Sequence, residues 1–199
     1  MSSLRSAVFM ALGIMGFTLP LIFVAVAIAY SPWFNIVNNA LSDLGHAIRS
    51  SVAPIFNLGL SLGGFIMSAH AIYYILPVSK LFGYLLGFSG YSLILIGVFD
   101  EAYGALHFVV SVVFFLSLAA FMIAYAIRNK SPWAVVGVGT GIVFWVLHFG
   151  YDVPKGAAIP ELISIAAFIP FYLKLLYNLK PKVLRSGEED SSCGGPAGI

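Results

Sequence analysis

Charged residues are scarce in this sequence. Asp, Glu, Lys and Arg make up only 9% of its 199 residues, whereas they make up about a quarter of an average soluble domain. The ten Lys and Arg residues are scattered along the chain. This scatter excludes the concentrated basic surface by which proteins bind nucleic acids.

Cysteine is almost absent, since Cys193 is the only one in the chain. An intramolecular disulfide is therefore excluded, and so is a metal site built from several cysteines. The His-Glu-x-x-His pattern of zinc hydrolases is absent as well.

Apolar residues are abundant: 60% of the residues are hydrophobic, and the mean hydropathy is +0.98. A membrane-spanning helix needs about 20 apolar residues. Uncharged runs of this length predict an all-α membrane protein, a bundle of six transmembrane helices near residues 7–30, 52–76, 81–99, 105–128, 133–150 and 158–178. We therefore expect a single transmembrane domain over residues 1–179. Residues 180–199 lose the apolar pattern and are predicted to form a disordered cytoplasmic tail.

The basic residues predict how the bundle is oriented. Eight of the ten fall on the side that holds both termini: Arg5, Lys80, Arg128, Lys130, Lys174, Lys180, Lys182 and Arg185. Only Arg49 and Lys155 fall on the opposite side. Because Lys and Arg mark cytoplasmic loops, we expect a multi-pass protein of the cell membrane with both termini in the cytoplasm. The outer face is then acidic and rich in histidine.

The connection over residues 31–51 has a helical pattern. Its apolar residues recur every three or four positions: Phe34, Val37, Leu41, Leu44 and Ile48. The polar residues between them are Asn35, Asn38, Asn39, Ser42, Asp43 and His46. This pattern predicts a short amphipathic helix at the outer interface, between the first two spans. Its polar face lines a cavity or meets water, and the sequence leaves both options open.

The start of the fourth span brings acids and a histidine together. If that helix begins near Asp100, then Asp100, His107 and Ser111 lie along one face. Asp100 and Glu101 also suit the positive end of a helix dipole, so simple capping is an alternative interpretation.

The ends of the fifth and sixth spans add further polar groups. His148 and Asp152 are four residues apart, so the carboxylate can orient the imidazole if the helix continues that far. Glu161 follows a proline in the first turn of the sixth span, where capping is again an alternative role. Asn57 lies on a strip of small residues of the second span, a pattern that packing alone can explain.

These groups form a candidate site at the outer face. The candidate catalytic acids and bases are Asp43, Asp100, Glu101, His107, His148 and Glu161. The candidate substrate-binding residues are Asn39, Ser42, Asn57 and Asp152. The candidate metal ligands are His46, His107 and His148, which suit zinc or another divalent metal. The alternative is a cluster of buried hydrogen bonds without chemistry.

Three stretches carry a family resemblance: Asn39 to Gly45 with Ile55 to Leu60, Gly97 to Glu101 with Leu106 and His107, and Ala158 to Ile163. Together they resemble the prokaryotic membrane family named domain of unknown function 998, a relative of the Frag1/DRAM/Sfk1-like six-helix proteins. The resemblance implies a six-helix bundle and marks the Ser-Asp-Leu-Gly, acid-then-His and Pro-Glu elements. It implies no reaction.

Three functions fit these observations. The first is a membrane-embedded hydrolase or lipid-modifying enzyme that acts on a lipid or lipid-linked substrate from the bilayer. The second is a small transporter or channel for cations or protons, whose acidic vestibule collects them. The third is a lipid-binding or scaffold protein in which the polar cluster only holds the helix ends together.

Overall fold

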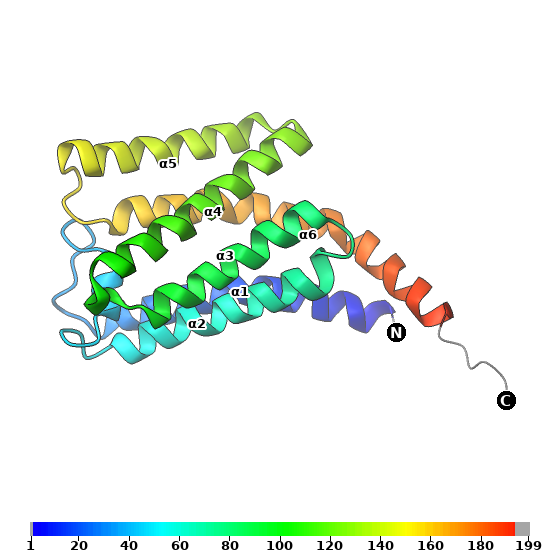
Figure 1. Ribbon diagram of the computed structural model, residues 1–199, viewed down its shortest axis with the longest axis horizontal. Helices are drawn as coiled ribbons and strands as arrows, with labels where there is room; N and C mark the ends of the chain where they lie inside the picture. The colour runs from blue at the N-terminus through cyan, green and yellow to red at the C-terminus, as the bar shows by residue number, and fades with distance from the viewer. Residues whose placement is uncertain (1, 194–199) are drawn as a thin grey trace.

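The computed structural model describes the backbone of residues 2–193 and the side chains of residues 4–186. Within this range lie six helices long and apolar enough to cross a membrane. They are α1 (Ser2–Ala29), α2 (Ala53–His70), α3 (Lys80–Val98), α4 (Ala105–Asn129), α5 (Pro132–Tyr151) and α6 (Ala158–Cys193). A π-helical turn, η2 (Ala71–Ile75), continues α2. The predicted six-helix membrane bundle is confirmed (Figure 1).

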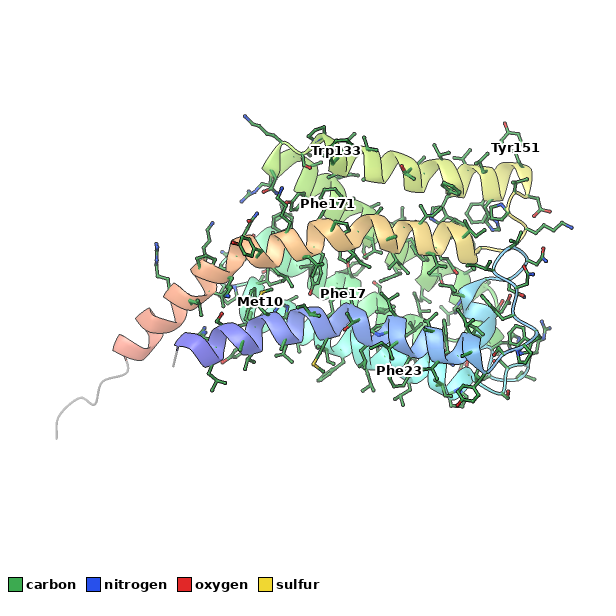
Figure 2. The ribbon with its side chains drawn as sticks, turned by 180° about the vertical axis from the view of Figure 1, so that it is seen from behind. Met10, Phe17, Phe23, Trp133, Tyr151 and Phe171 are labelled. Atoms are coloured by element: carbon green, nitrogen blue, oxygen red, sulfur yellow. The ribbon has the colours of Figure 1, made fainter. Side chains whose placement is uncertain are left out.

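The connections 30–52, 99–104 and 152–157 gather at one end of the bundle, which we call the polar end (Figure 1). Helix α1 begins at the opposite end. Trp133 and Tyr151 mark the two ends of α5 (Figure 2), and both are exposed. Their 18-residue separation corresponds to about 27 Å of helix, close to the thickness of the hydrocarbon core. Such aromatic residues favour membrane interfaces.

Helices α1, α2 and α3 form a closely packed half because glycines let their backbones approach. A Cβ atom on Gly64 would lie 2.5 Å from Gly90 O of α3. A Cβ atom on Gly63 would collide with the ring of Pro20 in α1. The small residues of α2 therefore serve helix packing, as one of the two interpretations of that strip predicted.

Helices α4, α5 and α6 form a looser half. α4 and α5 meet at the turn near residues 130–131 and diverge toward the polar end (Figure 1). Only 6% of the α5 span is buried, against 44% of the α2 span. Most of the surface of α5 is therefore not covered by the other helices.

The connection between α1 and α2 contains a much shorter helix than the 31–51 pattern predicts. Its helical part is the 3-10 helix η1 (Leu41–Gly45), in which Leu41 and Leu44 are buried. Asn35 Oδ1 accepts the N–H groups of Val37 (2.9 Å) and Asn38 (3.2 Å). Such local bonds compete with helical hydrogen bonding. They explain why residues 31–40 fold as turns.

Helix α6 is longer than the predicted span over 158–178. It continues through residues 180–193, where we expected a disordered tail, while residues 194–199 lie outside the described part. Leu179 and Val183 are both buried. Their apolar contacts extend the helix past the predicted boundary, because packing offsets the entropy of ordering the chain.

Candidate functional site

A cavity of about 1150 Å³ lies between α4, α5 and α6. Its walls are mostly apolar and aromatic, with Phe108, Phe115, Leu116, Trp145 and Phe149 among them. It extends along the helices as far as Gly137 of α5, so it reaches from the polar end deep into the bundle. This shape and composition suit a ligand with a long apolar part.

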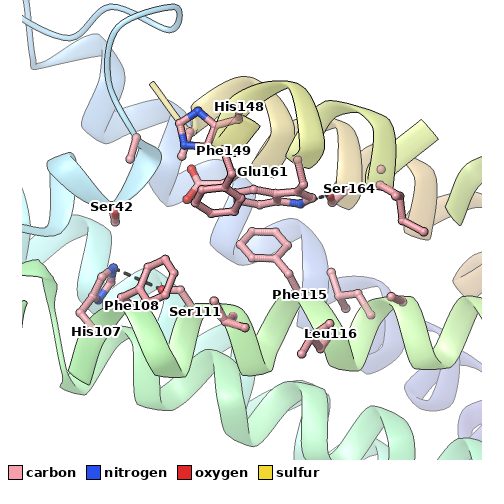
Figure 3. A pocket seen from close by; sticks show the side chains of 18 of the residues that line it. Ser42, His107, Phe108, Ser111, Phe115, Leu116, His148, Phe149, Glu161 and Ser164 are labelled. Carbon is pink, nitrogen blue, oxygen red and sulfur yellow. Dashed lines mark hydrogen bonds between the residues drawn. The ribbon is translucent and has the colours of Figure 1, made fainter. Parts of the chain in front are cut away.

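The polar end of the cavity contains six of the residues singled out in the sequence: Ser42, His46, Glu101, His107, His148 and Glu161. In Figure 3, His107 and Ser42 lie on one side of the opening, whereas His148 and Glu161 lie on the other. The structure thus brings together residues from η1, η3 and all three helices of the looser half. The predicted convergence of these acids and histidines is present.

Glu161 joins α6 to the connection between α1 and α2. Its side chain is buried, and its Oε2 accepts the backbone N–H of Leu41 at 2.8 Å. Two backbone bonds support the same junction, from Gly156 N to Val37 O (2.8 Å) and from Ala158 N to Asn39 O (3.0 Å). Glu161 therefore has a structural partner in addition to its place in the cavity wall.

Asp43 and Glu101 form a pair of neighbouring carboxyl groups. Asp43 Oδ2 accepts hydrogen bonds from Asn39 Nδ2 (2.8 Å) and Ala40 N (2.9 Å). Burial and then the charge of Asp43 raise the pKa of Glu101 to about 7, while Arg49 opposes the shift. Of the pair, Glu101 lines the cavity. A carboxyl group that titrates near pH 7 suits general acid or base catalysis.

His107 is held in one tautomer. Its Nδ1 lies 2.7 Å from Phe99 O, and its Nε2 lies 3.3 Å from Ser111 Oγ. A carbonyl oxygen only accepts hydrogen bonds, so Nδ1 carries the proton in neutral His107 and Nε2 is free to accept one. This buried histidine faces the cavity in a form ready to act as a base.

Asp100 does not belong to α4, contrary to our expectation of a shared face with His107. The helix begins at Ala105, and Asp100 instead precedes the 3-10 helix η3 (Glu101–Tyr103). Its Oδ1 accepts the N–H of Ala102 at 2.8 Å. The capping interpretation holds for Asp100 because a turn intervenes between α3 and α4.

His148 is oriented by a backbone carbonyl rather than by Asp152. Its Nδ1 lies 2.9 Å from Pro154 O. Asp152 adopts the left-handed conformation (φ 55°) that ends α5, and its side chain is exposed. The expectation that Asp152 orients His148 is therefore wrong, because the helix stops one residue before it.

The three candidate metal ligands His46, His107 and His148 all line the cavity. Among the described side chains, however, no group of three or more His, Cys, Asp or Glu residues is arranged to hold a metal ion. His46 Nδ1 accepts the N–H of Ile48 (3.3 Å), so this nitrogen already has a partner. The donor arrangement does not fit a preformed zinc site.

The other candidate substrate-binding residues lie away from the cavity wall. Asn39 supports Asp43 as described above. Asn57 Nδ2 donates to Gly45 O at 2.9 Å and so joins α2 to η1. Asn39, Asn57, Asp43, Asp100 and Asp152 are outside the set of residues that line the cavity.

The sequence analysis missed the roles of two polar residues of the cavity, Arg49 and Trp145. Arg49 was interpreted only as a topology signal, although it lines the cavity. Trp145 Nε1 donates to Ser164 Oγ at 3.1 Å, which joins α5 to α6 across the cavity wall. No sequence pattern marks such a contact between helices.

One serine motif is explained by packing. Residues 59–63 read Gly-Leu-Ser-Leu-Gly, which fits the letters of the nucleophile motif of α/β-hydrolases. That motif needs a strand, a sharp turn and a helix. Here it lies within α2, and a Cβ atom on Gly97 of α3 would lie 2.5 Å from Ser61 Oγ. Ser61 therefore belongs to the interface of α2 and α3.

Comparisons with known proteins identify a family but no activity. No functionally curated protein matches the chain, and no solved structure matches it. One family model, described as protein of unknown function (DUF998), matches residues 3–175. The match covers the first five spans, the first part of the sixth and every candidate site residue, so this chain belongs to the DUF998 family of proteins of unknown function.

Proposed function

We propose that this protein is a membrane-embedded enzyme that modifies the polar part of a lipid or lipid-linked molecule. The observation that supports the proposal is that one cavity combines a polar end with apolar walls. One end contains Glu101, His107, His148 and Glu161, while the walls below are apolar and aromatic. An amphiphile can place its polar group at the polar end and its apolar chain along the walls.

The acid and base chemistry is suited to neutral pH. In neutral His107 the nitrogen available to accept a proton is Nε2, because Nδ1 donates to Phe99 O. Glu101 has a pKa raised to about 7, which lets it donate a proton under the same conditions. One base and one acid at the same cavity are what hydrolysis or group transfer requires. Asp43 holds its neighbour Glu101 in this state and therefore acts as a positioning residue.

We further propose that the polar end faces outward and that both termini are cytoplasmic. The support is the excess of Lys and Arg on the side of the termini. In this orientation the substrate belongs to the outer leaflet. Labelling of a single cysteine introduced at Lys155, in a Cys193→Ser background, by a membrane-impermeant maleimide on intact cells tests this. Labelling only after lysis would reverse the assignment.

The binding step is tested with a matched pair of glycines on α5. Gly141 lines the cavity, whereas Gly139 is exposed outside the cavity wall, and a Cβ atom added to Gly139 would have no contact within 4 Å. We expect Gly141→Phe to fill the cavity and to deplete lipids that co-purify with the protein. Gly139→Phe retains them. Equal lipid content in both variants, measured by mass spectrometry, would contradict a lipid site in this cavity.

The catalytic step is tested on purified protein in nanodiscs that contain a lipid extract. We expect a product that is absent with His107→Ala and His148→Ala, at a rate lower by a factor on the order of 10² or more. Retained lipid without any product would leave a lipid-binding protein. Product formation indifferent to both substitutions would remove the proposed chemistry from this site.

A further inference from the structure

Three serines line the main cavity: Ser42, Ser111 and Ser164. Ser164 Oγ donates to Pro160 O (2.8 Å) and accepts from Trp145 Nε1 (3.1 Å). Among the described residues, Ser111 is the one of the three that is hydrogen-bonded to an imidazole. The three hydroxyls therefore differ in their chemistry although they share one cavity.

The hydroxyl of Ser111 is oriented by a chain of two hydrogen bonds. Because Nδ1 of His107 donates to Phe99 O, its Nε2 accepts, and Ser111 Oγ–H must be the donor over 3.3 Å. A nucleophile next to a base, with the base oriented by a third group, is the arrangement that activates serine in covalent catalysis. The distance is at the loose end of such contacts, as is common without substrate.

Ser111 also lies at the boundary between the polar and the apolar part of the site. It is six residues into α4, about 9 Å from the first residue of the helix. It lines both the main cavity and a second, apolar cavity of about 90 Å³ inside the bundle. In an amphiphile with its polar group at the polar end, the linkage to the apolar chain reaches this depth. In many lipids that linkage is a carboxylic ester.

We propose that Ser111 is the nucleophile that cleaves a carboxylic ester in an acyl lipid, with His107 as its general base. This inference rests on the proposed function and specifies its substrate class. Ser111 Oγ forms a bond to the ester carbonyl carbon while its proton passes to His107 Nε2. The C–O bond to the alcohol then breaks, and the alcohol leaves with that proton. Water, activated by His107, hydrolyses the acyl-serine and releases the fatty acid.

Ser42 is placed to assist this step. It lines the same two cavities as Ser111 and lies on the same side of the opening as His107 in Figure 3. Its hydroxyl is a donor for the negative charge that develops on the carbonyl oxygen. A donor of this kind typically contributes a factor on the order of 10² in rate.

The test is covalent labelling with a fluorophosphonate probe, which reacts with activated serines. We expect mass spectrometry of the intact protein in nanodiscs to find the phosphonate on Ser111. The label is lost in Ser111→Ala, and its rate falls by a factor on the order of 10² in His107→Asn. The matched control is Ser117→Ala on the same helix, because Ser117 bonds only to Ser89 Oγ and Phe114 O and lies outside both cavities. The Ser117→Ala variant should retain the label on Ser111.

A second measurement covers the case in which Ser111→Ala fails to fold. In a Cys193→Ser background, a thiol introduced by Ser111→Cys should react with iodoacetamide at least tenfold faster than in the double variant with His107→Asn. A label on any other serine, or equal thiol rates, overturns the inference. Lipid turnover without a label on Ser111 overturns the inference alone, whereas absence of turnover and of lipid binding overturns the proposed function.

Discussion

The two halves of the bundle are built by opposite means. In α1, α2 and α3, glycines bring backbones into contact, as at Gly64 and Gly90. In α4, α5 and α6, the helices diverge and enclose a cavity of about 1150 Å³, and α5 is almost unburied. The candidate acids and histidines of the cavity come from the looser half and from the connections that cover it. The packed half thus provides a rigid support for a site that needs space.

The largest expected effect is a difference in stability between the two halves when one glycine in each is replaced by leucine. Gly64→Leu places a side chain 2.5 Å from a backbone oxygen of α3, and we expect a loss of about 3 kcal/mol or failure to fold. Gly141→Leu meets only Ser164 Oγ at 3.6 Å, so its stability should stay within about 1 kcal/mol of the parent. Thermal unfolding in detergent measures both. Equal losses would show that the halves do not differ in packing.

The next effect tests the junction between η1 and α6. Glu161→Ala leaves the buried N–H of Leu41 without its acceptor, so we expect a loss of about 2 kcal/mol in the free energy of unfolding. Glu161→Gln keeps an oxygen acceptor and should recover more than half of that loss. If the two variants are equally unstable, the hydrogen bond to Leu41 is not the source of the effect.

A smaller effect appears as a dependence on pH. Burial and the charge of Asp43 raise the pKa of Glu101 from 4.5 to about 7, so the folded protein binds more protons than the unfolded chain between these values. Stability therefore falls as the pH rises through this window. After allowance for solvent screening we expect about 1 kcal/mol.

Glu101→Gln is the matched variant for this pH dependence. Because the amide does not titrate, the difference in melting temperature between pH 5 and pH 8 should become smaller than in the parent. An unchanged difference would show that Glu101 does not titrate in this range. Other carboxyl groups would then be responsible for the slope.

The smallest effect concerns the turn that leads into α5. Lys130 adopts the left-handed conformation (φ 48°) that ends α4, where glycine is favoured. Lys130→Gly should raise stability by about 0.5 kcal/mol, whereas Lys130→Ala should not. Chemical denaturation resolves a difference of this size only when the two variants are measured side by side. A gain in Lys130→Ala would point to charge rather than conformation.

The sequence predicts the spans well because the bilayer itself fixes how long an apolar helix must be. It also predicts that Glu101, Glu161 and the three histidines of the cavity meet, since helix ends at one membrane surface are neighbours. The bond between Leu41 and Glu161 joins residues 120 positions apart, and no local pattern encodes it.

Other features depend on details that a periodic pattern does not contain. The side chain of Asn35 caps its own turn, so the 31–51 helix shortens to η1. Asp152 adopts the left-handed conformation that ends α5, so its carboxylate does not orient His148. The cavity could not be predicted either, because it results from how far α5 stands from its neighbours.

Helix α6 has a consequence for how the protein responds to its membrane. Its 36 residues correspond to about 54 Å, well beyond the roughly 30 Å of the hydrocarbon core. Glu161 lies in its first turn, while Lys174, Lys180 and Lys182 lie toward its other end, where they favour water and anionic headgroups. The depth of the site in the bilayer therefore depends on where the other end of this helix meets the opposite membrane surface. Bilayer thickness then sets how deeply the site is immersed, and hydrophobic mismatch becomes a means of tuning it.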